Sequence, residues 1–278
     1  MSEYKGVRGT VWFRALTGQS APLLGDPASV LTADAPLGED TARFLCVVPD
    51  PAGRFPCARH GEVGLEEAYT LAARVREALE EDQRTTKRPI ISIVDVKSQA
   101  YGRREETAAI FLAAAAAADA YGTARLTGHP VITLVVGHAF SGAFLSHGYQ
   151  ANLLLAFDDN GVMIHAMHKD AAARITRRSV ESLEELGKTI APLSYDIRDY
   201  ARLGLLHRLL HVENPESPSE EGIQMVKKEL IVAIDAARTS PVDLRGRMQS
   251  AGALDMRKAS IRTRNLLEAQ WSDKGDSI

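Results

Sequence analysis

Short apolar runs rich in β-branched residues recur along the first 165 residues and predict buried strands. The strongest is V-I-T-L-V-V at 131–136, followed closely by glycine. Runs of this kind, bounded by turn formers, are typical of strands covered on both faces. The predicted strands occupy residues 44–48, 90–94, 131–136, 152–157 and 162–165, and a further strand-like piece lies at 9–15.

Between these runs the apolar residues recur at every third or fourth position, which predicts amphipathic helices. Residues 65–84 show this spacing most clearly. Residues 105–125 form an alanine-rich segment that opens with Glu105 and Glu106, and two acids suit the positive end of a helix dipole. Beyond residue 169, helices are predicted at 179–191, 196–203, 220–238 and 241–270.

The alternation of strands and helices predicts an α/β fold with parallel strands and right-handed crossovers. Ligands of such sheets bind at the carboxyl ends of the strands, where the loops 95–104 and 137–142 would lie. Residues 1–43, rich in Gly, Pro, Ala and Thr, are interpreted as an N-terminal extension. Residues 44–240 form the predicted main domain, and residues 241–278 a helical tail.

Composition and charge exclude several classes of function. The chain has 278 residues and a formal net charge of -3, so it lacks the basic character of a nucleic-acid-binding protein. Its two cysteines, Cys46 and Cys57, lack C-x-x-C spacing and are expected to be reduced thiols. No apolar segment is long enough to span a bilayer, and no secretory signal is visible. We therefore expect a cytoplasmic protein without a membrane partner.

The turn at 137–143 (G-H-A-F-S-G-A) is the best candidate for chemistry, because it joins the strongest strand to a predicted helix start. Free backbone N–H groups at a helix N-terminus attract negative charge, and glycine allows a close approach. We predict an oxyanion hole formed by the amides of Gly142 and Ala143. Gly137 and Ser141 in the turn, and Gly102 in the preceding loop, are candidate substrate-binding residues. A tight turn that serves packing alone remains the alternative.

Helical spacing after Gly142 suggests further groups near this turn. If a helix starts at Gly142, His147 and Gln150 share a face that projects near its mouth, with Tyr149 adjacent. All three are candidate catalytic residues, and a role at a subunit interface is the alternative.

Other motifs fail at particular positions. Ala139 replaces the glycine that a nucleophile elbow requires before Ser141, so Ser141 is interpreted as a helix N-cap rather than a nucleophile. The four histidines His138, His147, His165 and His168 lack a carboxylate or cysteine at matching spacing. No metal site is therefore expected.

Several stretches resemble the crotonase/carboxyltransferase family. Residues 131–143 resemble the strand, glycine turn and helix of carboxyltransferase domains, and Asp95 with G-R-R-E-E at 102–106 is similar to their loop and acidic helix. Residues 201–206 and 211–215 resemble a late helix and strand, although His207 stands where the family usually has an acid. With V-R-G-T at 7–10 and F-S-G-A-F at 140–144, the chain most resembles gamma subunits of biotin-independent malonate decarboxylases.

The resemblance implies a fold, a substrate and partners. The fold would be a crotonase-like spiral of ββα units with a helical C-terminal region. The chain would pair with a homologous beta subunit, with the active site between them, and an acyl-transferase alpha subunit would join the holoenzyme. The substrate would be a malonyl thioester on an acyl carrier protein, attached through phosphoribosyl-dephospho-coenzyme A. The pair would release CO2 through an enolate without biotin, metal or another cofactor bound to this chain.

Three other functions remain open at this point. The chain could be a non-catalytic partner that only completes an interface, which the serine in place of a second glycine at Ser141 would favour. It could be a stand-alone crotonase acting on a coenzyme A ester, although loop 95–104 holds only Asp95 before Glu105. A serine hydrolase using Ser141 is the third alternative.

Overall fold

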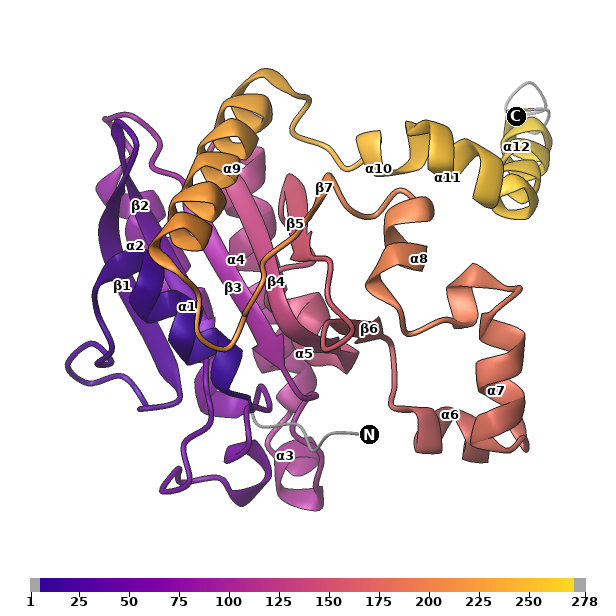
Figure 1. Cartoon of the computed structure of the whole chain (residues 1–278), viewed down its shortest axis with the longest axis horizontal. Helices are drawn as coiled ribbons and strands as arrows, with labels where there is room; N and C mark the ends of the chain where they lie inside the picture. Colours follow the sequence, from indigo (N-terminus) through magenta and orange to yellow (C-terminus); the bar gives the residue numbers. More distant parts are fainter. Residues whose placement is uncertain (1–5, 273–278) are drawn as a thin grey trace.

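A computed structural model describes residues 6–272, in which one seven-stranded sheet forms the centre (Figure 1). Residues 1–5 of the predicted extension and 273–278 of the predicted tail lie outside the described residues. The strands run in the order β1-β2-β3-β4-β5-β7, with β6 beside β4. Their bounds are β1 (Val30–Leu37), β2 (Asp40–Val47), β3 (Ile90–Val96), β4 (Val131–Phe140), β5 (Leu153–Phe157), β6 (Met163–His165) and β7 (Arg208–Leu210).

Strand pairing confirms the predicted parallel sheet. Every pair is parallel except β1–β2, which is antiparallel at the sheet edge. The long strand β4 pairs with β5 through residues 132–135 and then with β6 through residues 138–140. Strand β4 therefore changes its pairing partner along its length, and it continues to Phe140, through most of the predicted turn at 137–142.

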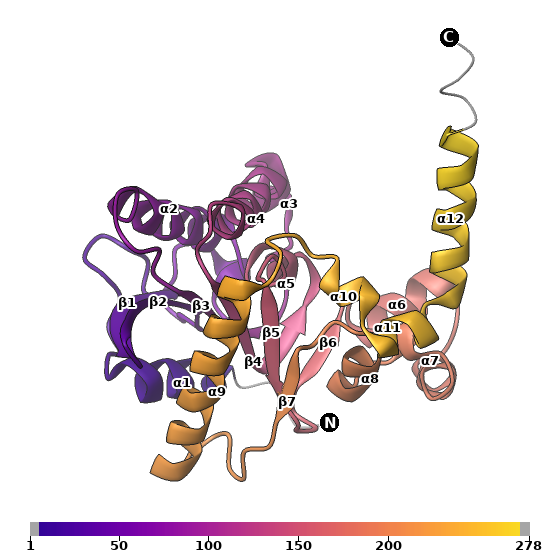
Figure 2. The ribbon, with the colours of Figure 1, turned by 90° about the horizontal axis from the view of Figure 1, so that it is seen from above.

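Helices cover both faces of the sheet (Figure 2). Helices α2 (Leu65–Glu81) and α4 (Ile110–Leu126) pack side by side on one face, and α1 (Val7–Thr17) and α9 (Glu220–Thr239) lie on the other. The remaining helices are α3 (Arg103–Thr107), α5 (Ser141–Ser146), α6 (Lys169–Thr176), α7 (Val180–Gly187), α8 (Ile197–Arg202), α10 (Gly246–Gln249), α11 (Ala251–Met256) and α12 (Lys258–Ser272), with short 3-10 turns at Pro56–Ala58 and Ala191–Leu193.

The predicted strand at 9–15 is wrong, because this segment is helix α1. Trp12, Phe13 and Leu16 recur at helical spacing and are almost completely buried. Gly9 lies so close to the sheet that a Cβ there would stand 3.0 Å from Cys46 Sγ. Burial of this face outweighs the local preference of aromatic and β-branched residues for strands. With β1 and the start of β2 in the sheet, the predicted boundary at residue 44 falls inside a strand.

Two long predicted helices are interrupted. The alanine-rich segment divides into α3 and α4 at Ala109, whose φ of 60° is left-handed. The segment 241–270 divides into α10, α11 and α12, with Ser250 capping α11 through its side chain. The other predicted helices appear within a few residues of their expected bounds, and α2 and α9 match most closely.

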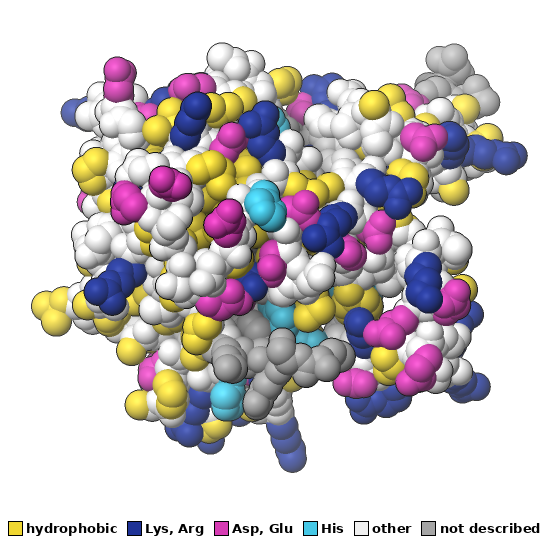
Figure 3. Space-filling view, in the orientation of Figure 1, with side chains coloured by type: hydrophobic (Ala, Val, Ile, Leu, Met, Phe, Trp, Pro, Cys, Tyr) yellow, Lys and Arg dark blue, Asp and Glu magenta, His cyan; other side chains and the backbone are white. Residues whose placement is uncertain are grey.

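The C-terminal helices α10–α12 lead away from the body, and α12 projects from it (Figure 2). Arginines fasten this segment to the body through backbone carbonyls: Arg247 donates to Tyr149 O and Ala151 O, and Arg257 donates to Leu203 O. Among the helices of residues 6–272, none combines the length and the apolar character that a transmembrane span requires. Acidic and basic side chains are interspersed over the face shown in Figure 3.

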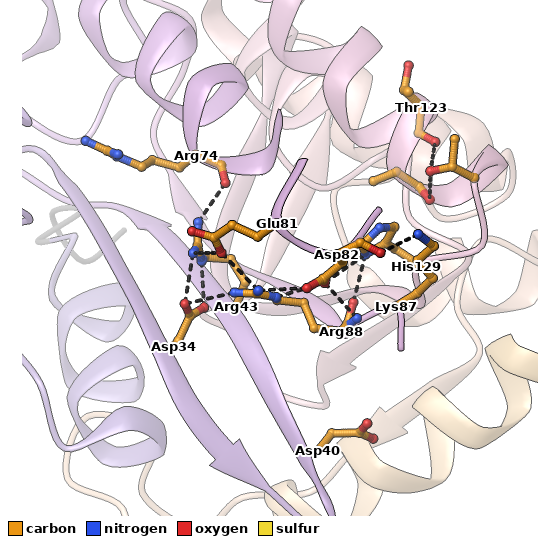
Figure 4. Close-up of polar contacts among 12 residues, drawn as sticks. Asp34, Asp40, Arg43, Arg74, Glu81, Asp82, Lys87, Arg88, Thr123 and His129 are labelled. Atoms are coloured by element: carbon orange, nitrogen blue, oxygen red, sulfur yellow. Dashed lines mark hydrogen bonds and ion pairs between the residues drawn. The ribbon is translucent and has the colours of Figure 1, made fainter. Parts of the chain in front are cut away.

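A network of paired charges lies at the amino ends of β3 and β4 (Figure 4). The Arg43 guanidinium donates two hydrogen bonds to Asp34, at 2.6 and 2.8 Å, and a third to the carbonyl of Arg74. Arg88 donates to both carboxylate oxygens of Asp82, at 2.7 and 2.8 Å, and also reaches Asp34 at 3.0 Å. The network joins β1, β2 and the end of α2 at the amino ends of the parallel strands, and the predicted site lies at their carboxyl ends.

Candidate functional site

The candidate site lies where β4 ends and the six-residue helix α5 begins, one residue before the helix start that the sequence predicted. Phe140 is the N-cap of α5, so the amides of Gly142 and Ala143 fall in its first turn and lack intrahelical partners. Among residues 6–272, neither amide donates a hydrogen bond to another group. Gly142 is half-buried and Ala143 is buried. Two backbone donors therefore remain free at a sheltered helix start.

Glycine at position 142 leaves room for the side chain of Gln99. An added Cβ would stand 2.2 Å from Gln99 Oε1, which belongs to the loop after β3. That loop is held in place because Val63 N–H donates to Ser98 O and Ala100 N–H donates to Val63 O, both at 2.9 Å. The loops at the ends of β3 and β4 thus meet at Gly142, as expected for the carboxyl edge of a parallel sheet.

Gly137 has a different position from the one predicted for it. It is buried within β4, where an added Cβ would stand 2.1 Å from Asp95 Oδ1. Asp95 is itself buried and accepts hydrogen bonds from Gly9 N and His138 N, at 3.1 and 3.0 Å. This position gives Gly137 a packing function, since its missing side chain makes room for a carboxylate that joins α1 to the sheet.

Ser141 is not the helix cap that the sequence suggested. The N-cap is Phe140, and no side chain makes the capping hydrogen bond. Ser141 has a left-handed φ of 63°, unusual for a residue other than glycine. Its Oγ lies 2.5 Å from the hydroxyl of Tyr101. Among the described residues its side-chain partner is thus a phenol, whereas a serine hydrolase uses an adjacent base such as an imidazole.

Gly102 lies beside this contact, immediately after Tyr101. It precedes α3 in an extended conformation, and an added Cβ would stand 2.2 Å from Glu105 Oε2. The structure therefore brings Gly102, Ser141 and Gly142 into one region, around the side chains of Gln99 and Tyr101. Sequence reasoning placed the loop 95–104 at this end of the sheet but missed Gln99 and Tyr101, because no sequence signal shows which side chains of that loop contact α5.

His147 is not at the mouth of the turn, because α5 ends at Ser146 and no longer helix face exists. The His147 side chain is completely buried, with Nδ1 3.0 Å from Tyr121 OH and Nε2 3.0 Å from Ile93 O. Burial lowers the pKa of His147 to about 4, although the hydrogen bond to Ile93 opposes this shift. His147 is a neutral core residue at neutral pH.

Tyr149 contacts the C-terminal segment, and the backbone of Gln150 contacts α4. The Arg247 guanidinium lies 5.3 Å from the centre of the Tyr149 ring and also donates to the carbonyl of Tyr149. The carbonyl of Gln150 accepts a hydrogen bond from Arg125 at 2.9 Å. The predicted face shared by His147 and Gln150 therefore does not exist, and within residues 6–272 only Tyr149 of these groups accepts a hydrogen bond from the C-terminal segment.

Three histidines gather with aromatic rings around the last residues of β4. Phe140 contacts His168 at 4.4 Å and His138 at 5.2 Å between ring centroids, and His165 stacks on Tyr195 at 4.1 Å. Burial, followed by the charges of His168 and Arg8, lowers the pKa of His138 to about 4. Across residues 6–272, no three His, Cys, Asp or Glu side chains are arranged to hold a metal ion. The cluster therefore surrounds Phe140, the residue directly before Ser141, with aromatic side chains.

The parallel sheet with helices on both faces is a crotonase-like fold, which confirms the predicted fold class. Transcarboxylase 12S has the same fold at 16% sequence identity, with a TM-score of 0.59 over 84% of this chain and 41% of that chain. At this level of identity the likeness concerns the fold alone.

The chain belongs to the malonate decarboxylase gamma subunit family, whose sequence model matches residues 58–271. A chain of a Pseudomonas malonate decarboxylase hetero-tetramer, solved with coenzyme A, is 55% identical, with a TM-score of 0.90 over 95% of this chain and all of that one. A chain of the Pseudomonas MdcD-MdcE hetero-dimer is 54% identical, with a TM-score of 0.87.

The same sequence is also related to a carboxyltransferase. Over 140 residues it is 41% identical to the malonyl-S-ACP:biotin-protein carboxyltransferase MADD of Malonomonas rubra. The match covers 49% of this chain and about half, 48%, of that relative.

Proposed function

We propose that this chain is one half of a heteromeric decarboxylase that acts on a malonyl thioester carried by an acyl carrier protein. Its partner would be a homologous beta subunit, as in the hetero-dimer of its Pseudomonas relative. The observation that carries the proposal is the pair of free amides at Gly142 and Ala143, in a member of the malonate decarboxylase gamma subunit family.

The chemistry of decarboxylation needs such donors. When the bond between the α-carbon and the carboxylate breaks, its electron pair stays on the substrate as an enolate and CO2 leaves. The two amides would hold a negatively charged substrate oxygen during this step, and fixed donors cost no reorganisation as charge develops. The enolate carbon then takes up one proton, which leaves an acetyl thioester on the carrier.

The other components follow from the same reading. The thioester would be linked through the phosphoribosyl-dephospho-coenzyme A group of the carrier, and an acyl-transferase alpha subunit would load the carrier. This chain would use neither biotin nor a metal, since backbone amides supply the stabilisation. The two free cysteines, Cys46 and Cys57, suit a cytoplasmic location.

The test removes one amide from the assembled complex. Gly142→Pro deletes the N–H group but also adds a Cβ that would meet Gln99 Oε1, whereas Gly142→Ala adds the same atom and keeps the N–H. Both are compared in a Gln99→Ala background, which removes the obstructing oxygen. We expect the proline variant to decarboxylate malonyl thioester about 100- to 1000-fold more slowly than the alanine variant.

Equal rates for these two variants would contradict the proposal and favour a passive partner subunit instead. A second measurement addresses the stand-alone crotonase. We expect the purified chain without its partner to show no turnover of malonyl or enoyl thioesters, so clear single-chain activity would contradict the half-site.

A further inference from the structure

The hydroxyl of Tyr101 is fixed at the start of α5 although its side chain is largely exposed. Tyr101 has 58% of its surface accessible, yet its OH lies 2.5 Å from Ser141 Oγ. An exposed phenol ordinarily bonds to water, but here the loop before it is anchored by the Ala100 and Val63 hydrogen bond of 2.9 Å. The phenol is thus held in a defined place while remaining open to solvent.

Ser141 adopts a strained backbone conformation that presents its hydroxyl to this phenol. Its left-handed φ of 63° is a conformation that glycine adopts freely and other residues adopt at a cost. The strain does not serve helix capping, because no side chain caps α5. Strain of this kind concentrates at functional sites, and Ser141 directly precedes the Gly142 amide.

The reaction requires an acid close to these amides, and the neighbouring groups do not supply it. His147 lies inside the core and donates or accepts only within it. Asp95 uses its carboxylate as an acceptor for the amides of Gly9 and His138. Glu105 is buried against Gly102. Tyr101 carries an O–H group, is accessible, and lies one hydrogen bond from the residue that precedes Gly142.

We propose that Tyr101 is the general acid that protonates the enolate, with Ser141 as its positioning residue. This rests on the proposed function. After CO2 leaves, the enolate electron pair forms a C–H bond with the phenolic proton of Tyr101. The Ser141 hydroxyl donates its hydrogen bond to the phenolate oxygen that results. A proton from solvent restores the phenol, so the net reaction consumes one proton, as conversion of a carboxylate to CO2 requires.

Two rates measured on the same assembled complex test this assignment. One is net release of CO2 from malonyl thioester on the carrier protein, and the other is exchange of labelled CO2 into that thioester. In Tyr101→Phe we expect net decarboxylation to fall by roughly 100-fold. Exchange should fall much less, because the enolate still forms but now recaptures CO2 instead of a proton.

A merely structural role of Tyr101 predicts a different result, in which both rates fall in the same proportion. That outcome, or net decarboxylation within about threefold of the unmodified complex, would overturn the assignment. Ser141→Ala keeps the phenol but loses its partner, so the ratio of exchange to net release should rise less than in Tyr101→Phe. Tyr69→Phe, at an exposed tyrosine on α2, is the matched control and should leave both rates unchanged.

The same measurements distinguish an error in the proposed function from an error in the role of Tyr101. If the unmodified complex does not decarboxylate malonyl thioester, the proposed function is wrong and this inference falls with it. If the unmodified complex is active and the two rates of Tyr101→Phe fall together, only the role of Tyr101 is wrong.

Discussion

Polar groups are paired at one end of the central sheet, whereas at the other end two amides are left without partners among the described residues. At the amino ends of the strands, Arg43, Asp34, Arg88 and Asp82 satisfy one another through paired hydrogen bonds (Figure 4). At the carboxyl ends, two amides of α5 have no partner among the described residues, and Ser141 is strained. One end is arranged for stability, and the other keeps donors available.

The difference teaches where a functional site can be recognised without a bound ligand. Unpaired hydrogen-bond donors raise the free energy of the folded chain, and so do residues other than glycine in a left-handed backbone conformation. Such features persist only where other interactions in the fold compensate for their cost. The paired network opposite can supply such compensation. The expected consequences of this contrast can be measured one at a time.

The largest expected effect is the loss of folding stability when the pH is lowered. Burial holds the folded-state pKa of His147 at about 4, below its ordinary value of 6.5, so the unfolded chain binds the proton more readily. Stability contributed by neutral His147 is fully present above pH 6.5 and is lost as the pH falls towards 4. The expected loss is about 3 kcal/mol of unfolding free energy across this window.

Urea unfolding at several pH values measures this loss, and His147→Gln serves as the comparison because glutamine does not titrate. We expect the variant to be less stable at pH 7.5, since it loses a core hydrogen bond, but to show a shallower pH dependence between 6.5 and 4. Asp82 contributes nothing to this window: burial opposes the shift, but the hydrogen bonds from Arg88 hold its pKa below the ordinary 3.8. Parallel curves for the two proteins would contradict the assignment of His147.

The next largest effect is the loss of folding stability when the charge network at the amino ends of the strands is disrupted. Arg43→Leu removes a guanidinium whose side chain is 5% exposed and leaves Asp34 with Arg88 alone. We expect a loss of about 2 kcal/mol in unfolding free energy, because the two hydrogen bonds to Asp34 and the one to the Arg74 carbonyl are lost, while the remaining acid is partly solvated and keeps Arg88. The rate of decarboxylation per folded complex should not change. Arg84→Leu, at an exposed position in the same part of the chain, should alter neither quantity.

Much of the fold could be predicted from the sequence because its signals are local. The β-branched runs at 90–94 and 131–136 and the apolar stripes of α2 and α9 are sufficient to place their elements. Strand β1 was missed because the alternation in V-L-T-A-D-A-P-L involves alanine, aspartate and proline, which are uncommon in strands, and the segment is stabilised by its pairing with β2. Helix α1 was misread because only tertiary burial of Trp12 and Phe13 distinguishes it from a strand.

The site could be predicted only in part, for a related reason. The free amides of Gly142 and Ala143 follow from a helix start after a strand, which is visible in the sequence. The contacts of Gln99 with Gly142 and of Tyr101 with Ser141 join segments about 40 residues apart, and no periodicity relates them. The misplacement of His147 and Gln150 followed from extending α5 beyond Ser146, where the chain turns into the core.

The smallest effect isolates the strain at Ser141. Ser141→Ala and Ser141→Gly both lose the hydrogen bond to Tyr101, so they differ mainly in the backbone preference at a φ of 63°. Glycine adopts this conformation without a steric penalty, but it gains more entropy on unfolding. We expect Ser141→Gly to be more stable than Ser141→Ala by about 1 kcal/mol, measured by urea unfolding.

The same pair of substitutions at Ser146, in the last position of α5, supplies the control. Ser146 has an ordinary helical backbone, so glycine there should be less stable than alanine by about 0.5–1 kcal/mol. The order of the two variants therefore reverses between the first and last residues of one short helix. If glycine is the less stable residue at both positions, Ser141 is not strained, and the contrast between the two ends of the sheet depends on the free amides alone.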